Sequence, residues 1–235
     1  WAICHITLTM AKIINHLFRD DKAQHQRVRA RLLSNSPELI SIKPISEIKV
    51  DDIASHAEVS KATFYKCFRS VEDLLNVSAK QAGQELLIPI NSVGLTISDI
   101  PLRTATKTRI AIRMMTGIPL LGRLMLNAEW PFGDVRHKGY QDVQKDIAAG
   151  IAQGCFTDMP LEIGANLVVT TLRVAVQDIL NSTHTEEYET QVIYTLLLSL
   201  GVHAKKAEEI SKIPFDQLPD LPKKGLIGKI LAVVA

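Results

Sequence analysis

Residues 50–75, VDDIASHAEVSKATFYKCFRSVEDLL, decide the fold of this chain. The stretch opens with Asp51 and Asp52, two carboxylates that stabilise the positive, N-terminal end of a helix. Ile53 and Ala57 follow four residues apart, so a helix here presents a small apolar face to a core. The pattern predicts a short first helix that packs against another element.

A second short helix is predicted directly after a break at Glu58. Ser60 is a favourable N-cap residue, and Phe64 and Phe68 lie four apart on the face that would be buried. The opposite face is basic and rich in hydroxyl groups, with Lys61, Thr63, Tyr65 and Lys66. The stretch 59–71 holds three basic residues and no acidic one. Two short helices joined by a turn, with such a face on the second, are what a helix-turn-helix needs to read the major groove of DNA.

Outside this stretch, apolar residues recur at helical spacing and no alternating strand pattern is present. We predict helices at 22–42, 50–57, 61–67, 71–90, 102–128, 138–153, 160–181, 186–200 and 203–212. The predicted fold class is therefore all α, with an N-terminal three-helix helix-turn-helix domain followed by a larger helical domain.

Composition limits the partners of the chain. Its 235 residues include 27 basic and 25 acidic side chains, a formal net charge of +2, so any DNA contact must come from a local patch. Cys4, Cys67 and Cys155 are odd in number and widely spaced, which fits neither a disulfide framework nor a zinc site and favours a reducing cytoplasm. Polar residues interrupt the apolar stretch 1–18, which predicts an N-terminal extension rather than a membrane span.

The order of residues in the decisive stretch resembles the TetR family of transcriptional regulators. Across this region the family typically reads Ile-Ala, then Ala-Gly-Val-Ser, then Thr, an apolar residue, Tyr, two more residues, Phe, and a closing Lys-Glu-x-Leu. The sequence matches that pattern at Ile53, Ala54, Ala57, Val59, Ser60, Thr63, Phe64, Tyr65, Phe68, Glu72 and Leu74. A looser resemblance covers residues 145–210, where the matches are mostly packing and capping residues.

The resemblance implies where DNA would be contacted and how the chain would be divided. It places Ser60, Lys61, Thr63, Tyr65 and Lys66 at operator DNA, with Arg29 or Arg31 reaching a flanking phosphate. It also implies a helical domain that binds a small effector and dimerises. The expected division is an N-terminal extension at 1–18, a DNA-binding domain at 19–78, an effector-binding and dimerisation domain at 79–213, and a C-terminal tail at 214–235.

Three departures from the family pattern keep a second hypothesis open. Glu58 stands where the family has its turn glycine, which places a carboxylate near the duplex and requires a left-handed backbone that glutamate disfavours. Val71 replaces a lysine that would contact phosphate, and Pro37 predicts that the first helix is kinked or starts afresh at Ser36. The second hypothesis is a helical small-molecule-binding or interaction protein with a degenerate helix-turn-helix and no specific DNA binding.

Residues 110–140 combine flexible methionines with amphipathic aromatic side chains, which suits a pocket for an apolar ligand with one or two polar anchors. The candidate effector residues are Met114, Met115, Met125, Trp130, Phe132, His137 and Tyr140, although the same residues would serve as ordinary core. Segments 166–180 and 188–200 carry wide apolar stripes. In the TetR family two such helices form a dimer interface, so we expect a homodimer; the alternative is the core of a monomer.

Motifs of enzymes are missing from the sequence. It has no glycine-rich phosphate loop, no His-Glu-x-x-His and no nucleophile elbow, and its seven histidines lack metal-ligand spacing, so no catalytic residue, metal or cofactor is predicted. A third hypothesis, an enzyme with a helical pocket, would need Arg113, His137 and Tyr140 to converge.

The C-terminal stretch mixes lysines with an apolar run, which predicts a tail that is docked on its own domain or disordered, or alternatively a membrane-surface amphipath. Taken together, the resemblance implies a ligand-responsive repressor that binds a near-palindromic operator as a homodimer, and we expect it in the cytoplasm without a membrane partner.

Overall fold

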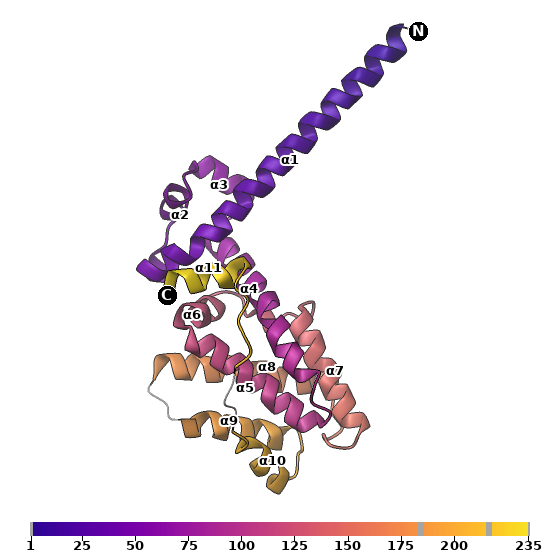
Figure 1. The fold of residues 1–235 in the computed structure, drawn as a ribbon, viewed down its shortest axis with the longest axis vertical. Helices are drawn as coiled ribbons and strands as arrows, with labels where there is room; N and C mark the ends of the chain where they lie inside the picture. Colours follow the sequence, from indigo (N-terminus) through magenta and orange to yellow (C-terminus); the bar gives the residue numbers. More distant parts are fainter. Residues whose placement is uncertain (1, 183–185, 215–217, 235) are drawn as a thin grey trace. The chain divides into compact units, whose positions relative to one another are not determined.

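The computed structural model describes residues 2–182, 186–214 and 218–234, with the backbone alone for residues 2–21 and 186. All regular secondary structure in these residues is helical, which confirms the predicted all-α fold (Figure 1). The chain divides into two compact units, Trp1–Leu74 and Leu75–Ala235, called unit 1 and unit 2 below.

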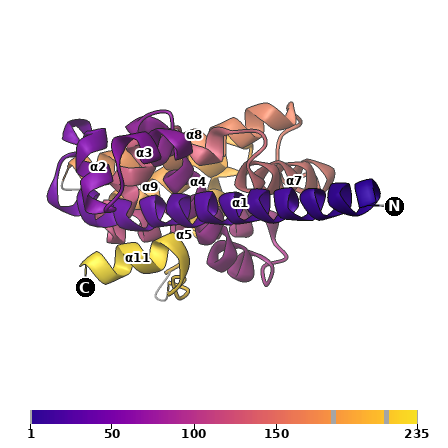
Figure 2. The same cartoon turned by 90° about the horizontal axis from the view of Figure 1, so that it is seen from above.

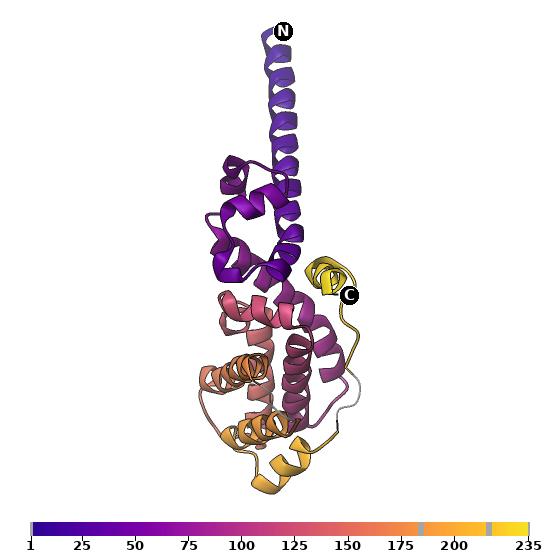
Figure 3. The same ribbon diagram turned by 90° about the vertical axis from the view of Figure 1, so that its left-hand side faces the viewer.

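Unit 1 contains α1 (Ala2–Ile42), the short 3-10 helix η1 (Ile45–Glu47), α2 (Val50–His56) and α3 (Lys61–Cys67). Figure 2 shows α1 as one unbroken helix, so the predicted segment 22–42 is only its second half. Helices α2 and α3 pack on each other and against α1 (Figure 3). The core of unit 1 is apolar and includes Leu32, Leu39, Ile40, Ile53, Ala54, Ala57, Phe64 and Phe68.

The fresh start of the first helix predicted at Ser36 is wrong, because α1 continues through Pro37 to Ile42. A proline in a helix has no N–H to donate to the carbonyl four residues before it. In α1 that carbonyl belongs to Leu33, and it accepts a hydrogen bond of 2.9 Å from the Ser36 hydroxyl instead. The side chain of Ser36 thus supplies the donor that the backbone of Pro37 lacks.

Helix α4 (Val71–Gly94) begins in the last residues of unit 1 and continues into unit 2. Unit 2 further contains α5 (Ile100–Gly117), α6 (Pro119–Asn127), the 3-10 helix η2 (Pro131–Gly133), α7 (Lys138–Ala152), α8 (Leu161–Asn181), α9 (Glu186–Ser199), α10 (Ala204–Ser211) and α11 (Gly225–Val234). The predicted single helix at 102–128 is wrong, since α5 and α6 are separated at Ile118. Ile118 precedes Pro119, and a residue before proline disfavours the helical region. Its φ of −123° and ψ of 87° lie outside that region.

Helix α8 is the centre of unit 2 and packs against α5, α6, α7 and α9. Of the helices in the described residues, it is the one long and apolar enough to cross a membrane by length and composition. Seven of its residues are instead buried in the core: Gly164, Ala165, Val168, Val169, Leu172, Ala175 and Val176. Its apolar character is therefore used for packing within unit 2.

The C-terminal stretch forms α11, which contacts α6 and buries Leu226, Ile227 and Ile230. Glu85 of α4 caps its first turn by accepting hydrogen bonds from the backbone N–H groups of Leu226, at 2.9 Å, and Ile227, at 2.8 Å. The docked form predicted for the tail is thus observed for residues 225–234, while residues 215–217 and 235 of that tail lie outside the described residues.

Candidate functional site

The first candidate site is the outer face of α3 in unit 1. Ser60 caps this helix, because its hydroxyl accepts a hydrogen bond of 3.1 Å from the Thr63 N–H. Phe64 is fully buried, so the opposite side of α3 is turned outward, and Tyr65 there is 57% exposed. The imidazole of His25 on α1 lies 2.9 Å from the Lys66 carbonyl oxygen and ties the end of α3 to α1. The Ser60 cap therefore fixes the start of α3, and the His25 contact fixes its end.

The turn before α3 has the left-handed backbone that the resemblance to the TetR family implies at Glu58. Glu58 has φ 50°, in the left-handed region where glycine is normally found. Arg31 of α1 reaches this turn, and its Nη2 atom donates to the Glu58 carbonyl oxygen at 3.2 Å and to the carboxylate Oε2 at 2.9 Å. A single guanidinium nitrogen thus binds both the backbone and the side chain of the turn residue.

Several of the predicted DNA-contacting side chains already have partners within unit 1. Lys61 pairs with Asp51 at 2.6 Å, and the Arg29 guanidinium lies 4.5 Å from the centroid of the Phe68 ring. The hydroxyls of Ser60 and Thr63 are 2.8 Å apart. The side chains of Tyr65 and Lys66 are exposed on the surface of α3. All seven predicted DNA-contacting residues lie on α3, at its N-cap or on α1.

Sequence reasoning missed the part of α1 that lies beside this face. A polar groove is lined by Lys22, Gln24, His25 and Val28 of α1 together with Thr63, Lys66 and Cys67. No sequence motif predicts these α1 residues, because they lie about forty positions before α3. The packing of α1 against α3 brings them beside this face.

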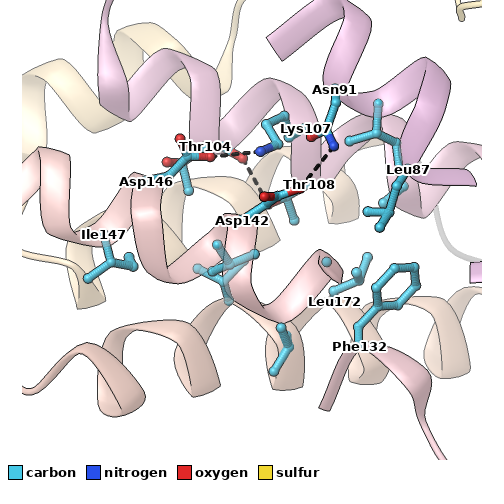
Figure 4. A pocket seen from close by; sticks show the side chains of 16 residues that line it. Leu87, Asn91, Thr104, Lys107, Thr108, Phe132, Asp142, Asp146, Ile147 and Leu172 are labelled. Carbon is cyan, nitrogen blue, oxygen red and sulfur yellow. Dashed lines mark hydrogen bonds and ion pairs between the residues drawn. The ribbon is translucent and has the colours of Figure 1, made fainter. Parts of the chain in front are cut away.

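The second candidate site is a cavity of about 50 Å³ inside unit 2. Its walls come from α4, α5, η2, α7 and α8, and it is large enough for a few water molecules as it stands. Figure 4 shows polar side chains along one side of it and Phe132 and Leu172 on the other. The polar side consists of Asn91, Thr104, Lys107, Thr108, Asp142 and Asp146.

Two hydrogen-bonded pairs tie α7 to its neighbours at the polar side. Asn91 Nδ2 of α4 donates to Asp142 Oδ2 at 3.0 Å, and Lys107 Nζ of α5 lies 2.8 Å from Asp146 Oδ2. Asp142 and Asp146 are four residues apart on α7, and therefore one turn apart. The two carboxylates thus face different helices across one edge of the cavity.

Thr104 adds a polar group that has no partner within the described residues. Its side chain is 4% exposed, its Oγ1 atom is fully buried, and it lines the cavity. Its neighbour Thr108 differs, because the Thr108 hydroxyl donates to the Thr104 carbonyl oxygen at 2.8 Å. A buried hydroxyl without a partner is costly, so Thr104 marks a place where a ligand atom or water would be stabilised.

Among the seven predicted effector residues, Phe132 lines this cavity. Met114, Met115 and Met125 are buried in the core, and Trp130 packs edge-on against Phe132 with ring centroids 5.5 Å apart. His137 caps α7 through Nδ1, which accepts a hydrogen bond of 3.1 Å from the Gly139 N–H. Burial lowers the pKa of His137, and the nearby charge of Lys80 lowers it further.

Tyr140 and Arg113 make separate contacts. The Tyr140 hydroxyl donates to Asn166 Oδ1 at 3.1 Å, and burial raises its pKa. Arg113 Nε lies 2.8 Å from Glu189 Oε2. His137, Tyr140 and Arg113 thus each bind a different partner.

Within the described residues, no group of three or more His, Cys, Asp or Glu side chains could hold a metal ion. Cys67 and Cys155 are free thiols, and burial raises the pKa of both. The side chain of Cys4 lies outside the described residues.

A third surface lies over α8 and α9, the two helices predicted to form a dimer interface. A shallow groove between them is lined by Thr170, Thr171, Val174, Ala175, Tyr188, Gln191, Val192, Thr195, Leu196 and Ser199. Beside this groove Leu198 is 38% exposed, and Val174 in it is 48% exposed. Exposed apolar side chains over paired helices are typical of an association surface.

Comparison with known proteins gives one family match. Residues 32–77 match the family model of bacterial regulatory proteins of the tetR family. A search of curated proteins finds no match.

Solved structures share the fold of this chain over most of its length. RolR in complex with its ligand resorcinol is 21% identical with a TM-score of 0.72, and the match covers 83% of this chain and 98% of RolR. RolR without ligand is 22% identical with a TM-score of 0.69, covering 82% and 100%. FadR from Bacillus halodurans, a fatty acid degradation regulator, is 16% identical with a TM-score of 0.55, covering 73% and 94%. These likenesses show that the two-unit helical fold is shared with such regulators.

Proposed function

Since this chain belongs to the TetR family of bacterial regulatory proteins, we propose that it is a ligand-responsive repressor that binds a near-palindromic operator as a homodimer. The observation that carries the proposal is the outer face of α3, on which Tyr65 and Lys66 are exposed while Phe64 is buried. A capped helix that presents a basic, hydroxyl-rich face can enter a major groove and contact both phosphates and base edges.

The cavity of unit 2 is our proposed effector site, with Phe132 on its apolar side and Thr104, Asp142 and Asp146 on its polar side. The other predicted residues, Met114, Met115, Met125, Trp130, His137 and Tyr140, are assigned a supporting role around it. The lining suits a small molecule with an apolar body and one or two hydrogen-bonding groups, and the cavity would have to widen from its about 50 Å³ to admit one. The resorcinol complex of RolR, a structure of the same fold, supports hydroxylated aromatic compounds as the first ligands to test.

The proposed homodimer uses the apolar surface over α8 and α9, and a two-fold dimer would present two α3 helices to half-sites about one helical turn of DNA apart, roughly 34 Å. We assign DNA binding to residues 19–78, effector binding and dimerisation to 79–213, and a tail to 214–235. The proposed location is the cytoplasm.

Light scattering tests the dimer: Val174→Asp, in the groove, is expected to halve the molar mass, whereas Lys205→Asp on α10 leaves it unchanged.

Selection from a random-sequence duplex library with the purified protein tests DNA binding. The expected result is an enriched near-palindrome whose affinity falls steeply with salt and resists non-specific competitor. Tyr65→Phe is the matched variant, because it removes one hydroxyl and keeps the edge-on contact of the Tyr65 and Phe64 rings at 5.5 Å. Absence of any enriched sequence would contradict the proposal.

A second function is favoured by one observation, the contact between Arg31 and Glu58 in the helix-turn-helix. If that contact disables DNA binding, the protein is a small-molecule-binding or interaction protein. Thermal shift with a panel of hydroxylated aromatics, including resorcinol, separates the two functions: a stabilising ligand without DNA selectivity supports the second, and a ligand that also releases operator DNA supports the first.

A further inference from the structure

The turn of the helix-turn-helix and α3 together carry one acidic side chain, Glu58. Between Ile53 and Val71, Glu58 is the single Asp or Glu residue in the sequence. Its side chain is 86% exposed, and it lies in the turn that leads into α3. A carboxylate at this place repels the phosphates that the neighbouring lysines would attract.

The same carboxylate also holds a cation. Arg31 Nη2 lies 2.9 Å from Glu58 Oε2 and 3.2 Å from the Glu58 carbonyl oxygen, and the Arg31 side chain remains 44% exposed. The left-handed backbone of Glu58, with φ 50°, is part of the turn to which this guanidinium binds. Arg31 is therefore within reach of solvent and of a phosphate, but it is occupied by an internal partner.

We propose that Glu58 is a selectivity residue, which weakens non-specific DNA binding more than operator binding by adding a negative charge and by occupying Arg31. The inference rests on the proposed DNA binding. Non-specific affinity is electrostatic and follows the charge of the protein face. In a closely docked operator complex base contacts add affinity, and Arg31 can exchange the Glu58 carboxylate for a phosphate. This new phosphate contact of Arg31 then partly offsets the repulsion by Glu58, in the specific complex alone.

The test compares Glu58→Gln with the unaltered protein on two probes, the operator obtained by selection and a random duplex of equal length. Glutamine keeps the size of the side chain and an oxygen that accepts from Arg31, but removes the charge. The expected result is a rise in random-duplex affinity of about 3-fold to 10-fold at low salt, with a smaller rise for the operator. The matched control is Glu47→Gln, an exposed acid of η1 in the same unit, which is expected to change both affinities little and equally.

Arg31→Ala, alone and combined with Glu58→Gln, separates the two parts of the proposal. If Glu58 acts partly by occupying Arg31, its replacement has a distinctly smaller effect when Arg31 is absent. Equal effects in both backgrounds would leave Glu58 as a bare charge and overturn the role of Arg31.

Equal changes on both probes, or none, would overturn the selectivity role. Circular dichroism and unfolding measurements on every variant show whether the helix-turn-helix stays folded. Glu58→Gly provides a second variant without the charge, and glycine suits the left-handed backbone of this turn. A wild-type protein that does not prefer any sequence over the random duplex would refute DNA-binding regulation itself. Preference for the operator that is unaffected by Glu58→Gln would refute this inference alone.

Discussion

Arg109 Nε of α5 lies 2.7 Å from Glu189 Oε1 of α9, and both side chains are at most 10% exposed. The Arg109 guanidinium also donates to two carbonyl oxygens at the end of α10, Ser211 at 2.7 Å and Ile213 at 2.9 Å. Burial lowers the pKa of Arg109, and Glu189 opposes that change. One buried cation thus joins three helices of unit 2.

Replacing Arg109 with alanine is expected to lower the free energy of unfolding by about 3 kcal/mol, because the buried Glu189 carboxylate would keep Arg113 alone of these two cations and the Ser211 and Ile213 carbonyl oxygens would lose their donor. Urea unfolding followed by circular dichroism measures the loss. Lys212→Ala, which removes a solvent-exposed partner of Glu208, is the control and should cost a small fraction of that amount. Equal losses for the two variants would show that burial of the Arg109 pair is not what matters.

His137 is expected to make the stability of the protein depend on pH. Because burial lowers its pKa in the folded state, the unfolded chain binds the proton more readily, and stability is lost as the pH falls below about 6.5. His137→Asn keeps an N-cap acceptor for the Gly139 N–H and removes the titrating ring. Unfolding free energies between pH 7.5 and 5.5 should therefore fall less steeply in the variant. His203→Asn, at the exposed N-cap of α10, controls for the change of cap, and an unaltered slope in His137→Asn would assign the pH dependence elsewhere.

Lys66→Ala is expected to weaken binding to operator and random DNA alike, and to reduce the salt slope of binding by about one unit, since one phosphate contact is lost. The backbone contact from His25 to the Lys66 carbonyl remains available in the variant, so α3 should stay in place. Titrations at several salt concentrations measure the slope, with Lys205→Ala on α10 as the charge-matched control. A slope that does not change would remove Lys66 from the phosphate contacts.

Thr104→Val and Thr108→Val form a matched pair in the cavity wall. Thr104→Val removes a buried hydroxyl without a described partner, so the ligand-free protein should keep or gain stability, while a ligand that binds this hydroxyl should lose affinity about 10-fold. Thr108→Val removes a hydroxyl that already donates to a backbone carbonyl, so its effect should fall on stability, by about 1 kcal/mol, rather than on ligand affinity. Thermal shift with and without ligand reports both quantities, and identical behaviour of the two variants would argue against Thr104 as a ligand contact.

The helix-turn-helix could be predicted because its signals are local. The cap of Ser60, the spacing of Phe64 and Phe68, and the left-handed turn at Glu58 all depend on residues within a few positions of one another. The contact from Arg31 to Glu58 could not be predicted, since it depends on how α1 packs against the turn.

The cavity shows the opposite case, because its lining comes from four long helices and η2. Flexible and aromatic side chains suggested a pocket among residues 110–140, yet Met114 and Met115 are buried in the core away from its lining. Composition does not distinguish a methionine that faces a cavity from one that faces another helix. Likewise, Pro37 considered alone predicted that the first helix is kinked or starts afresh. In the structure the Ser36 hydroxyl donates to the Leu33 carbonyl oxygen, and α1 continues through Pro37.

The two carboxylates of α7 that line the cavity are both already bound by side chains of neighbouring helices. Asp142 is bound to α4 through Asn91, and Asp146 is bound to α5 through Lys107. In the proposed effector site, a ligand that takes the carboxylate oxygen bound by Asn91 or by Lys107 must replace that side chain, so its binding depends on an exchange of hydrogen bonds. Exchange at Asp142 would break the contact with Asn91 of α4, whereas exchange at Asp146 would leave Arg103 of α5, whose Nε lies 3.6 Å from Asp146 Oδ1. Two ligands of equal size but different hydrogen-bonding pattern would then weaken the attachment of α7 to different neighbours.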